Sequence, residues 1–261
     1  MVSRDTAVAD RPPRRGGHRL RAPRPHHTLH RRALPPAYDT VVCLSDMRVQ
    51  AAFPSPRPSG LRLRPDGVAF LAGAGPVLDL AYPADAALLV VGVPGAGKTT
   101  LIERLFSSSV VEVLDTETIR ERWQARLGTT RGYRLYRPLV HLEHHLRVRR
   151  ALAGTSPLVV HETGTKGWLR LRVAREAHEH GRSLHLVALD VPRAMAEAGQ
   201  RARGRRVRRR SMDRHEQGFA ALRWALRCDP EEVPVGPDGF ASCLVLDRAA
   251  AERLRTVVFG P

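Results

Sequence analysis

Short apolar runs alternate with amphipathic stretches from residue 83 to the end of the chain. The apolar runs are found at 87–91, 110–114, 157–160, 184–189 and 243–246. Stretches between them carry apolar residues at helical spacing. Strands that alternate with helices through right-handed crossovers predict an α/β fold of three layers, with about five mostly parallel strands and helices on both faces.

The chain before this alternating region has a different character. Residues 1–58 are rich in Arg, Pro and His and show little periodicity, so we expect a disordered basic arm. A start of translation at Met47 is an alternative that would remove most of this arm. Residues 59–82 hold short alternating pieces separated by Gly and Pro, which predict a small hairpin. It would lead into a nucleotide-binding domain at 83–261.

A phosphate-binding motif lies between the first apolar run and the helix after it. The motif G-x-x-x-x-G-K-[ST] is matched in full by Gly92, Val93, Pro94, Gly95, Ala96, Gly97, Lys98 and Thr99. Glycines let the backbone come close to an anion, and the start of the following helix favours negative charge. This pattern predicts a P-loop NTPase fold that binds ATP.

Three side chains at the end of the motif have separate expected roles. Lys98 would reach the β and γ phosphates, the Thr99 hydroxyl would bind Mg²⁺, and Thr100 would support the α phosphate. The chain has 43 Lys and Arg residues, yet only Lys98 and Lys166 are lysines. Lysine therefore stands where a compact ammonium is needed, a role that a planar guanidinium fills poorly.

Candidate catalytic groups follow the second apolar run. Asp115 ends this run, and carboxyl ends of strands form the ligand sites of open α/β sheets. We expect Thr116 to cap a helix whose apolar face holds Ile119, Trp123 and Leu127 and which stops at Gly128. Glu117 and Arg120 lie one turn apart near its start. A carboxylate there could take a proton from an acceptor hydroxyl, and the Arg could hold the acceptor.

The P-loop followed by Asp-Thr-Glu-Thr-Ile-Arg at 115–120 resembles a P-loop kinase group. This group holds polynucleotide 5′-hydroxyl kinases, zeta toxins and chloramphenicol phosphotransferases, often described as AAA-type ATPase domains. It has an acid three positions before an Arg, so the resemblance implies Glu117 as the base and Arg120 as the substrate-binding Arg. The group usually has Asp there, which leaves Asp115 as the alternative base.

Two further site segments follow the third and fourth apolar runs. His161-Glu162-Thr163 stands where an acid would hold Mg²⁺ or its water shell, and Glu162 is the candidate. The segment 201–214 carries eight Arg and one acid. In the resembling kinases this position is a lid whose arginines close over the nucleotide, which implies Arg203 and Arg205. The same segment could also attract a nucleic-acid acceptor.

Residues 130–153 predict a linker and then a helix. Pro138 suits its first turn, and Leu139, Leu142 and Leu146 share one face. His141 and His145 are four residues apart, but no third metal ligand is evident. We therefore expect them to face substrate or solvent.

Charge and composition limit the class of protein. The net charge is +17, and 14 of these charges lie in 1–58 and 201–214. No apolar run reaches the roughly 18 residues of a membrane span, so we expect a cytoplasmic protein without a membrane partner. The leading expectation is an ATP-dependent kinase for a hydroxyl acceptor, either a small molecule or a nucleic-acid end. Alternatives are an ATP-hydrolysing switch and a nucleic-acid-binding protein.

Overall fold

The computed structural model describes residues 60–107, 111–128, 132–204, 207–228 and 239–260. All of them belong to one compact unit. The arm expected at 1–58 and the candidate Arg205 lie outside the described residues. Within the described part of the chain, no helix combines the length and the apolar content that crossing a membrane requires.

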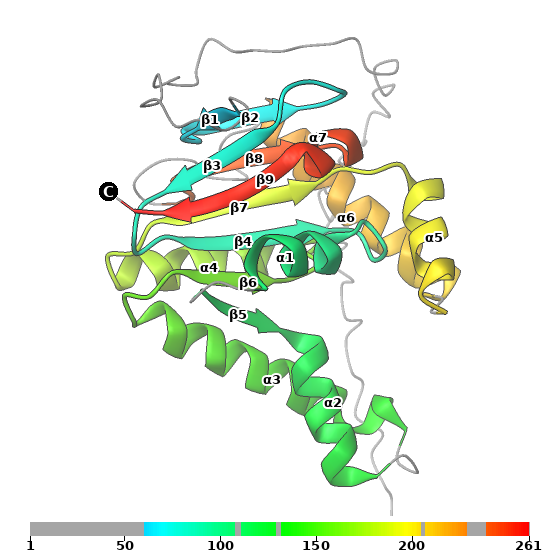
Figure 1. Cartoon of the computed structure of the whole chain (residues 1–261). Coiled ribbons are helices and arrows are strands. Elements are labelled where there is room, and N and C mark those ends of the chain that lie inside the picture. The colour runs from blue at the N-terminus through cyan, green and yellow to red at the C-terminus, as the bar shows by residue number, and fades with distance from the viewer. Residues whose placement is uncertain (1–59, 108–110, 129–131, 205–206, 229–238, 261) are drawn as a thin grey trace, which may run out of the picture. The chain divides into compact units, whose positions relative to one another are not determined.

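A sheet of six parallel strands forms the centre of the molecule (Figure 1). In spatial order its strands are β2 (Gly67–Leu71), β8 (Ser242–Leu246), β7 (Leu184–Leu189), β4 (Ala87–Gly92), β6 (Leu158–His161) and β5 (Glu112–Asp115). Every residue of β4 and β7 is buried, as expected for central strands covered on both faces. The expected class of sheet is confirmed, with one strand more than predicted because β2 joins its edge.

A second, smaller sheet has three parallel strands. They are β1 (Leu61–Leu63), β3 (Leu78–Tyr82) and β9 (Leu254–Phe259), with β3 in the middle. The hairpin predicted at 59–82 is therefore wrong. β1 and β3 pair in parallel, and β2 between them in sequence pairs with β8 of the large sheet. Glycine and proline marked the strand ends correctly, but β2 and β3 also pair with β8 and β9 from the distant end of the chain.

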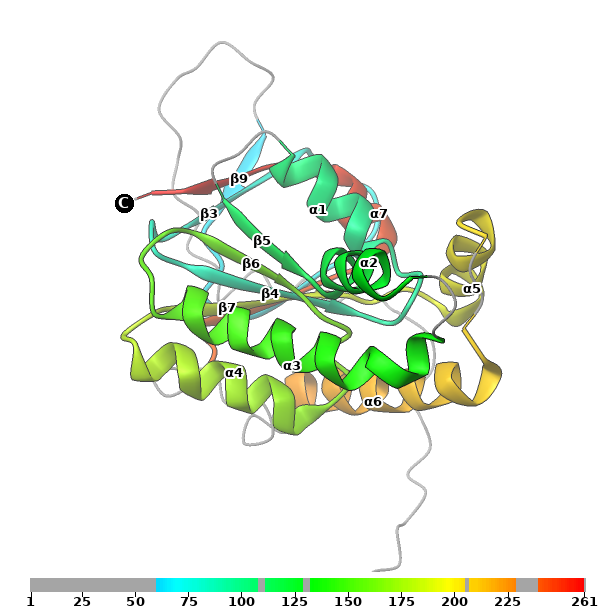
Figure 2. The ribbon, with the colours of Figure 1, turned by 90° about the horizontal axis from the view of Figure 1, so that it is seen from below.

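Helices cover both faces of the large sheet, as predicted (Figure 2). The helices are α1 (Lys98–Phe106), α2 (Thr116–Leu127), α3 (Tyr133–Leu152), α4 (Gly167–Glu179), α5 (Arg193–Ala202), α6 (Arg209–Cys228) and α7 (Arg248–Arg253). One face carries α1 and α7, and the other carries α3, α4 and α6. Helix α1 also reaches the small sheet, because Leu101 and Phe106 line one apolar pocket with Val90 of β4 and Val257 of β9.

Helix α3 differs from its prediction in two respects. It begins at Tyr133, so Pro138 lies inside the helix rather than in its first turn. Leu139, Leu142 and Leu146 do share a face, but this face is exposed to solvent. The buried row runs from Tyr136 through Val140, His144 and Val148 to Leu152.

Candidate active site

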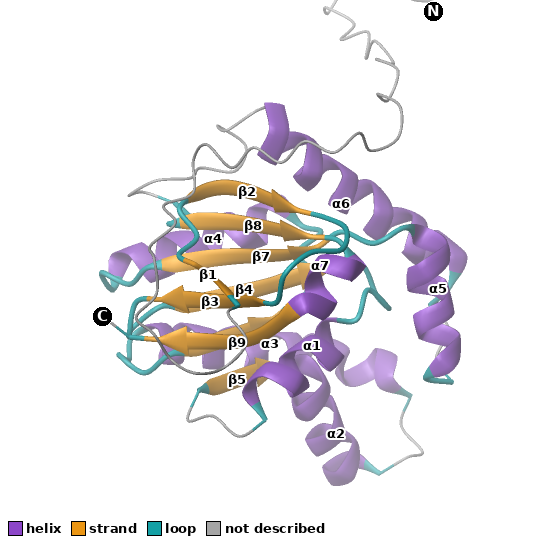
Figure 3. Ribbon diagram, turned by 45° about the horizontal axis from the view of Figure 1, so that its top comes forward, coloured by secondary structure: helices purple, strands orange, loops and turns teal. Residues whose placement is uncertain are grey.

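The carboxyl ends of the parallel strands meet at one edge of the large sheet (Figure 3). From β4 the chain passes through α1 to β5 on one side, whereas β7 lies on the other side of β4. Such a switch in direction opens a crevice at the strand ends where α/β proteins bind ligands. The P-loop, Gly92–Thr99, follows β4 at this point.

The backbone of the P-loop requires glycine. Gly95 has φ 88° and Gly97 has φ 99°, in the region that residues with a Cβ rarely adopt. Gly97 is the N-cap of α1 and supplies no side chain to the free N–H groups of the first turn, which also contains no acid. Unpaired N–H groups at a helix start favour an anion.

Lys98 folds back onto its own loop. Its Nζ donates to the carbonyl oxygens of Gly92, at 2.7 Å, and Val93, at 3.2 Å. The residue is 6% exposed, and burial lowers the Lys98 pKa to about 8, although the charges of Glu162 and Asp115 act against this shift. An ammonium with only neutral acceptors beside it is ready to exchange them for phosphate oxygens.

Asp115 has a structural task at the end of β5. Its Oδ1 accepts from the backbone N–H of Glu117 at 3.1 Å, so Asp115, and not the predicted Thr116, is the N-cap of α2. His161 Nδ1 lies 3.1 Å from the same oxygen. Burial raises the pKa of Asp115, but the hydrogen bond and charge of His161 and the N–H of Glu117 outweigh it and hold the pKa below its ordinary value.

Glu117 and Arg120 form an ion pair on the first turn of α2. Each side chain is 30% exposed, so the pair borders the site without being enclosed. The Arg120 guanidinium also lies 5.7 Å from the ring centre of Tyr133, which begins α3. The predicted packing of α2 is confirmed, since Ile119 is buried and Trp123 and Leu127 pack against its cluster.

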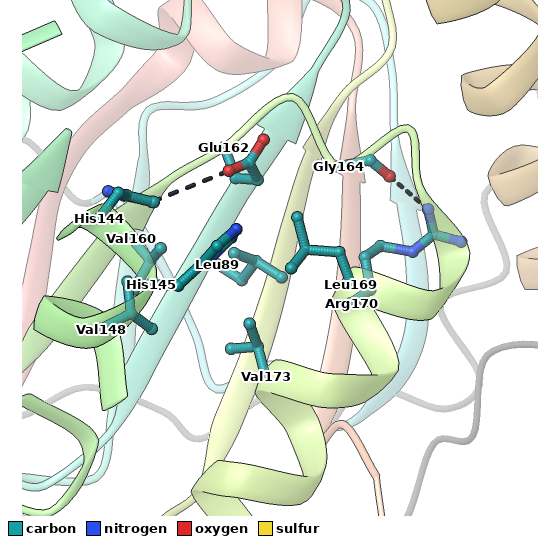
Figure 4. Close-up of a pocket in the computed structure, with 10 residues that line it drawn as sticks. All are labelled: Leu89, His144, His145, Val148, Val160, Glu162, Gly164, Leu169, Arg170 and Val173. Atoms are coloured by element: carbon teal, nitrogen blue, oxygen red, sulfur yellow. Dashed lines mark hydrogen bonds and ion pairs between the residues drawn. The ribbon is translucent and has the colours of Figure 1, made fainter. Parts of the chain in front are cut away.

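Glu162 follows β6 and stands at the polar rim of an apolar pocket (Figure 4). One carboxylate oxygen accepts from the backbone N–H of Thr163, at 2.9 Å, and from its hydroxyl, at 3.1 Å. The other lies 3.8 Å from Nε2 of His144, which α3 buries. Burial lowers the His144 pKa to about 4, so this ring is neutral near pH 7.

The oxygen donors at this edge suit Mg²⁺ in their chemistry. The Thr99 hydroxyl at the start of α1 and the Glu162 carboxylate are the hard ligands that this ion prefers. Among the described residues, no group of three or more His, Cys, Asp or Glu side chains could hold a metal on its own.

Two basic groups approach the start of α1 from other elements. Arg203, after α5, donates to the hydroxyl of Thr100. Arg248, the first residue of α7, comes so close to the loop that a Cβ on Gly97 would lie 2.6 Å from its guanidinium. Arg104 holds the end of α7 by donating to the carbonyl of Leu254 at 2.8 Å and to two others nearby. The sequence analysis missed Arg248, because nothing near it in the chain marks it.

Helix α6 closes the site beside Glu162. His215 Nδ1 and the Thr165 hydroxyl share a hydrogen bond of 3.2 Å. A Cβ on Gly218 would lie 2.3 Å from the Thr165 carbonyl oxygen, so α6 lies directly against the loop after β6. Burial lowers the pKa of His215, and the charge of Lys98 lowers it further. His215 was also missed by the sequence analysis.

Comparison with known proteins agrees with this arrangement. The family model described as AAA domain matches residues 88–225, which is more than half of the chain. A search of curated proteins found no match.

Two solved structures are similar to this chain over 65% and 67% of its length. One, from the PezAT chromosomal toxin-antitoxin system of Streptococcus pneumoniae, has 14% identity and a TM-score of 0.50 over 65% of this chain and 70% of that one. A gluconokinase from Sinorhizobium meliloti 1021 has 18% identity and a TM-score of 0.40 over 67% and 90%. The chain therefore belongs to the AAA domain family.

Proposed function

We propose that the protein transfers the γ-phosphoryl group of ATP to a hydroxyl acceptor. The observation that carries this proposal is the position of Lys98. Its ammonium lies at the switch point of the sheet, feels the charges of Glu162 and Asp115, and donates to two loop carbonyls. ATP phosphates would replace these carbonyls and restore full charge to the ammonium.

The residues around the phosphates mainly position them and balance their charge. The loop amides and Lys98 would hold the β and γ phosphates, with Thr100 next to the α phosphate. Thr99 and Glu162 would hold Mg²⁺, which when bound neutralises charge on the phosphates. The His144 ring does not compete for the Glu162 carboxylate as a cation, because its pKa of about 4 keeps it uncharged near pH 7.

Glu117 is the better candidate for the base. Asp115 already accepts from the helix N-terminus and from His161, and both contacts lower its pKa and thus its basicity. Glu117 lies partly exposed, where an acceptor could approach. Arg120, paired with it, would hold the acceptor and align the carboxylate with its hydroxyl.

Arginines would stabilise the charge that develops on the transferred group. Arg203 is placed for this role through its contact with Thr100 at the start of α1. Arg248 approaches the same helix start from α7. Arg205 stays a prediction, since it lies outside the described residues.

The fate of the γ phosphate tests the proposal. The protein is incubated with ATP labelled at the γ position, Mg²⁺ and pooled acceptors: polynucleotides with 5′-hydroxyl ends, nucleotide sugars and small hydroxyl metabolites. We expect label on one acceptor class, lost in Lys98→Ala and kept in Arg149→Ala, which changes an exposed residue at the far end of α3. Label released only as inorganic phosphate, with each pool tested, would instead indicate an ATP-hydrolysing switch.

A further inference from the structure

Gln200 makes an unusual set of contacts near the end of α5. It is 7% exposed, and both the nitrogen and the oxygen of its side-chain amide form hydrogen bonds. Nε2 donates to the carbonyl of Pro94 in the P-loop at 2.8 Å, and Oε1 accepts from the backbone N–H of Val207 at 2.9 Å. Nε2 also lies 3.5 Å from the sulfur of Met212 in α6. One side chain thus joins the P-loop to the residues that lead into α6.

The backbones of α5 and of the P-loop pack closely around this amide. A Cβ on Gly95 would lie 2.1 Å from the carbonyl oxygen of Ala196, and one on Gly199 would lie 2.6 Å from the carbonyl oxygen of Gly95. These are contacts between main chains, which cannot turn aside as flexible side chains can. Helix α5 and the P-loop therefore form one packed unit.

In the sequence, Arg203 lies between Gln200 and Val207, the residue whose N–H Gln200 binds. The chain leaves α5 at Ala202, and Arg203 contacts Thr100 before the chain reaches Val207. Breaking the Gln200 contacts would take from the part-buried Pro94 carbonyl and Val207 N–H the partner that each has in Gln200, which destabilises this arrangement. The hydrogen bonds of Gln200 to Pro94 and Val207 thus hold the chain in place on both sides of Arg203.

We propose that Gln200 is a positioning residue that ties Arg203 to the P-loop, so that phosphates bound in the loop and the arginine keep one geometry. This rests on the proposed phosphoryl transfer. An arginine that acts on charge developing during transfer must hold its place in the transition state, where misplacement affects the rate more than ATP binding. Loss of the tie should therefore lower kcat more than it raises the KM for ATP.

Two variants separate the hydrogen bonds from the packing. Gln200→Met keeps the length of the side chain and removes both hydrogen bonds. Gln200→Glu keeps an acceptor for the Val207 N–H but turns a carboxylate oxygen toward the Pro94 carbonyl, a repulsion that protonation of the carboxyl would relieve. Gln217→Met is the matched control, because Gln217 is exposed on α6.

We expect Gln200→Met to lower kcat by about 10- to 100-fold, with a smaller change in KM. Gln200→Glu should recover activity relative to the wild type as the pH falls from 8 to 6, which a merely structural residue would not show. Hydrogen exchange of the Val207 amide gives a readout without turnover. ATP with Mg²⁺ should slow this exchange in the wild type and not in Gln200→Met.

Equal kcat values for Gln200→Met and Gln217→Met, or an ATP effect on Val207 exchange that survives in Gln200→Met, would overturn the proposal. If Gln200→Met does not fold, a flat ratio of Gln200→Glu to wild-type activity across pH overturns it in the same way. Failure of the proposed function looks different. In that case the wild type itself transfers no label to any acceptor, whatever the Gln200 variants do.

Discussion

At the residue scale the central question is which carboxylate accepts the proton of the acceptor. Asp115 caps α2 and contacts His161, whereas Glu117 pairs with Arg120 and is 30% exposed. The same sequence motif supplies both carboxylates two residues apart. Because Asp115 caps a helix, we propose that Glu117 and not Asp115 accepts the proton.

Changing each acid to its amide tests this assignment. Glu117→Gln should lower phosphoryl transfer by about 100-fold or more while ATP affinity stays within a few fold of the wild type. Asp115→Asn should keep most of the activity, because asparagine is also a good N-cap. Single-turnover rates and ATP binding are the two measurements. The reverse order of effects would make Asp115 the base.

Sequence located the residues that are contiguous and missed those that folding brings in. Gly92 to Thr99 form one motif, so their spacing alone identified the loop. Arg248, Gln200 and His215 reach the site from α7, α5 and α6, and each has an ordinary neighbourhood in the sequence. The N-cap of α2 was placed one residue late because Asp115 and Thr116 are both good capping types.

At the element scale the contact between the P-loop and α5 is the tightest part of the site. Gly95 has both a positive φ and no space for a Cβ, because the Ala196 carbonyl would lie 2.1 Å away. A side chain at this position would clash with that carbonyl unless the loop or the helix moved. This contact holds the phosphate-binding backbone against the helix that carries Gln200.

Gly95→Ala should therefore lower the free energy of unfolding by more than the strain of its positive φ alone would. Gly181 is the matched control, since it has φ 64° and no atom within 4 Å of the place a Cβ would take. Gly181→Ala should lower the free energy of unfolding by about 1–2 kcal/mol. Gly95→Ala should lower it further and also weaken ATP binding. Denaturant unfolding measures the stability of each variant, and ATP titration measures its affinity. An equal loss of stability in Gly95→Ala and Gly181→Ala would mean that α5 shifts easily to make room for the methyl group.

The sequence predicted where helices and strands lie along the chain better than it predicted which helix face is buried and which strands pair. Helix α3 carries two apolar rows, and spacing alone could not say which row meets the sheet. The leucine row lies in solvent, with Leu135 76% exposed, while the row through Val140 and Val148 is buried. The strands at 61–82 were marked by their turns, but β2 and β3 pair with β8 and β9 near the other end of the chain.

At the scale of the whole molecule, buried histidines make stability depend on pH. His185 lies in central strand β7, with Nδ1 2.8 Å from the Ser242 hydroxyl and its ring 4.7 Å from that of Tyr82. Burial lowers its pKa from 6.5 to about 4. Between these values the unfolded chain binds more protons than the folded one, so stability falls as the pH falls from 6.5 to 4.

Removing the titrating ring should flatten this dependence. His185→Asn keeps a polar partner for Ser242 but cannot take up a proton. From pH 6.5 to 4 it should lose less unfolding free energy than the wild type, by up to about 3 kcal/mol. His180→Asn, at an exposed position, is the control. Urea unfolding across this range measures the difference, and parallel curves for His185→Asn and the wild type would contradict the assignment.

The class of the whole fold followed from the sequence because strands and helices alternate along it. The six-stranded parallel sheet with helices on both faces is the consequence. The small sheet did not follow, because its strand β9 comes after α7, beyond the last apolar run recognised in the sequence. A strand that pairs only with non-local partners has little local signal of its own.

Calorimetry of ATP with Mg²⁺ at pH 8 tests the central claim, that Lys98 holds the nucleotide phosphates. Because the pKa of Lys98 is about 8 in the free protein, about half of its amines are neutral at this pH. Phosphates beside the amine should raise its pKa, so binding should take up roughly half a proton in the wild type. Comparing buffers of different ionisation enthalpy measures this uptake. It should fall at pH 6.5 and be absent in Lys98→Met, which should also bind ATP more weakly. Equal affinity and equal proton uptake in Lys98→Met and the wild type would contradict the account.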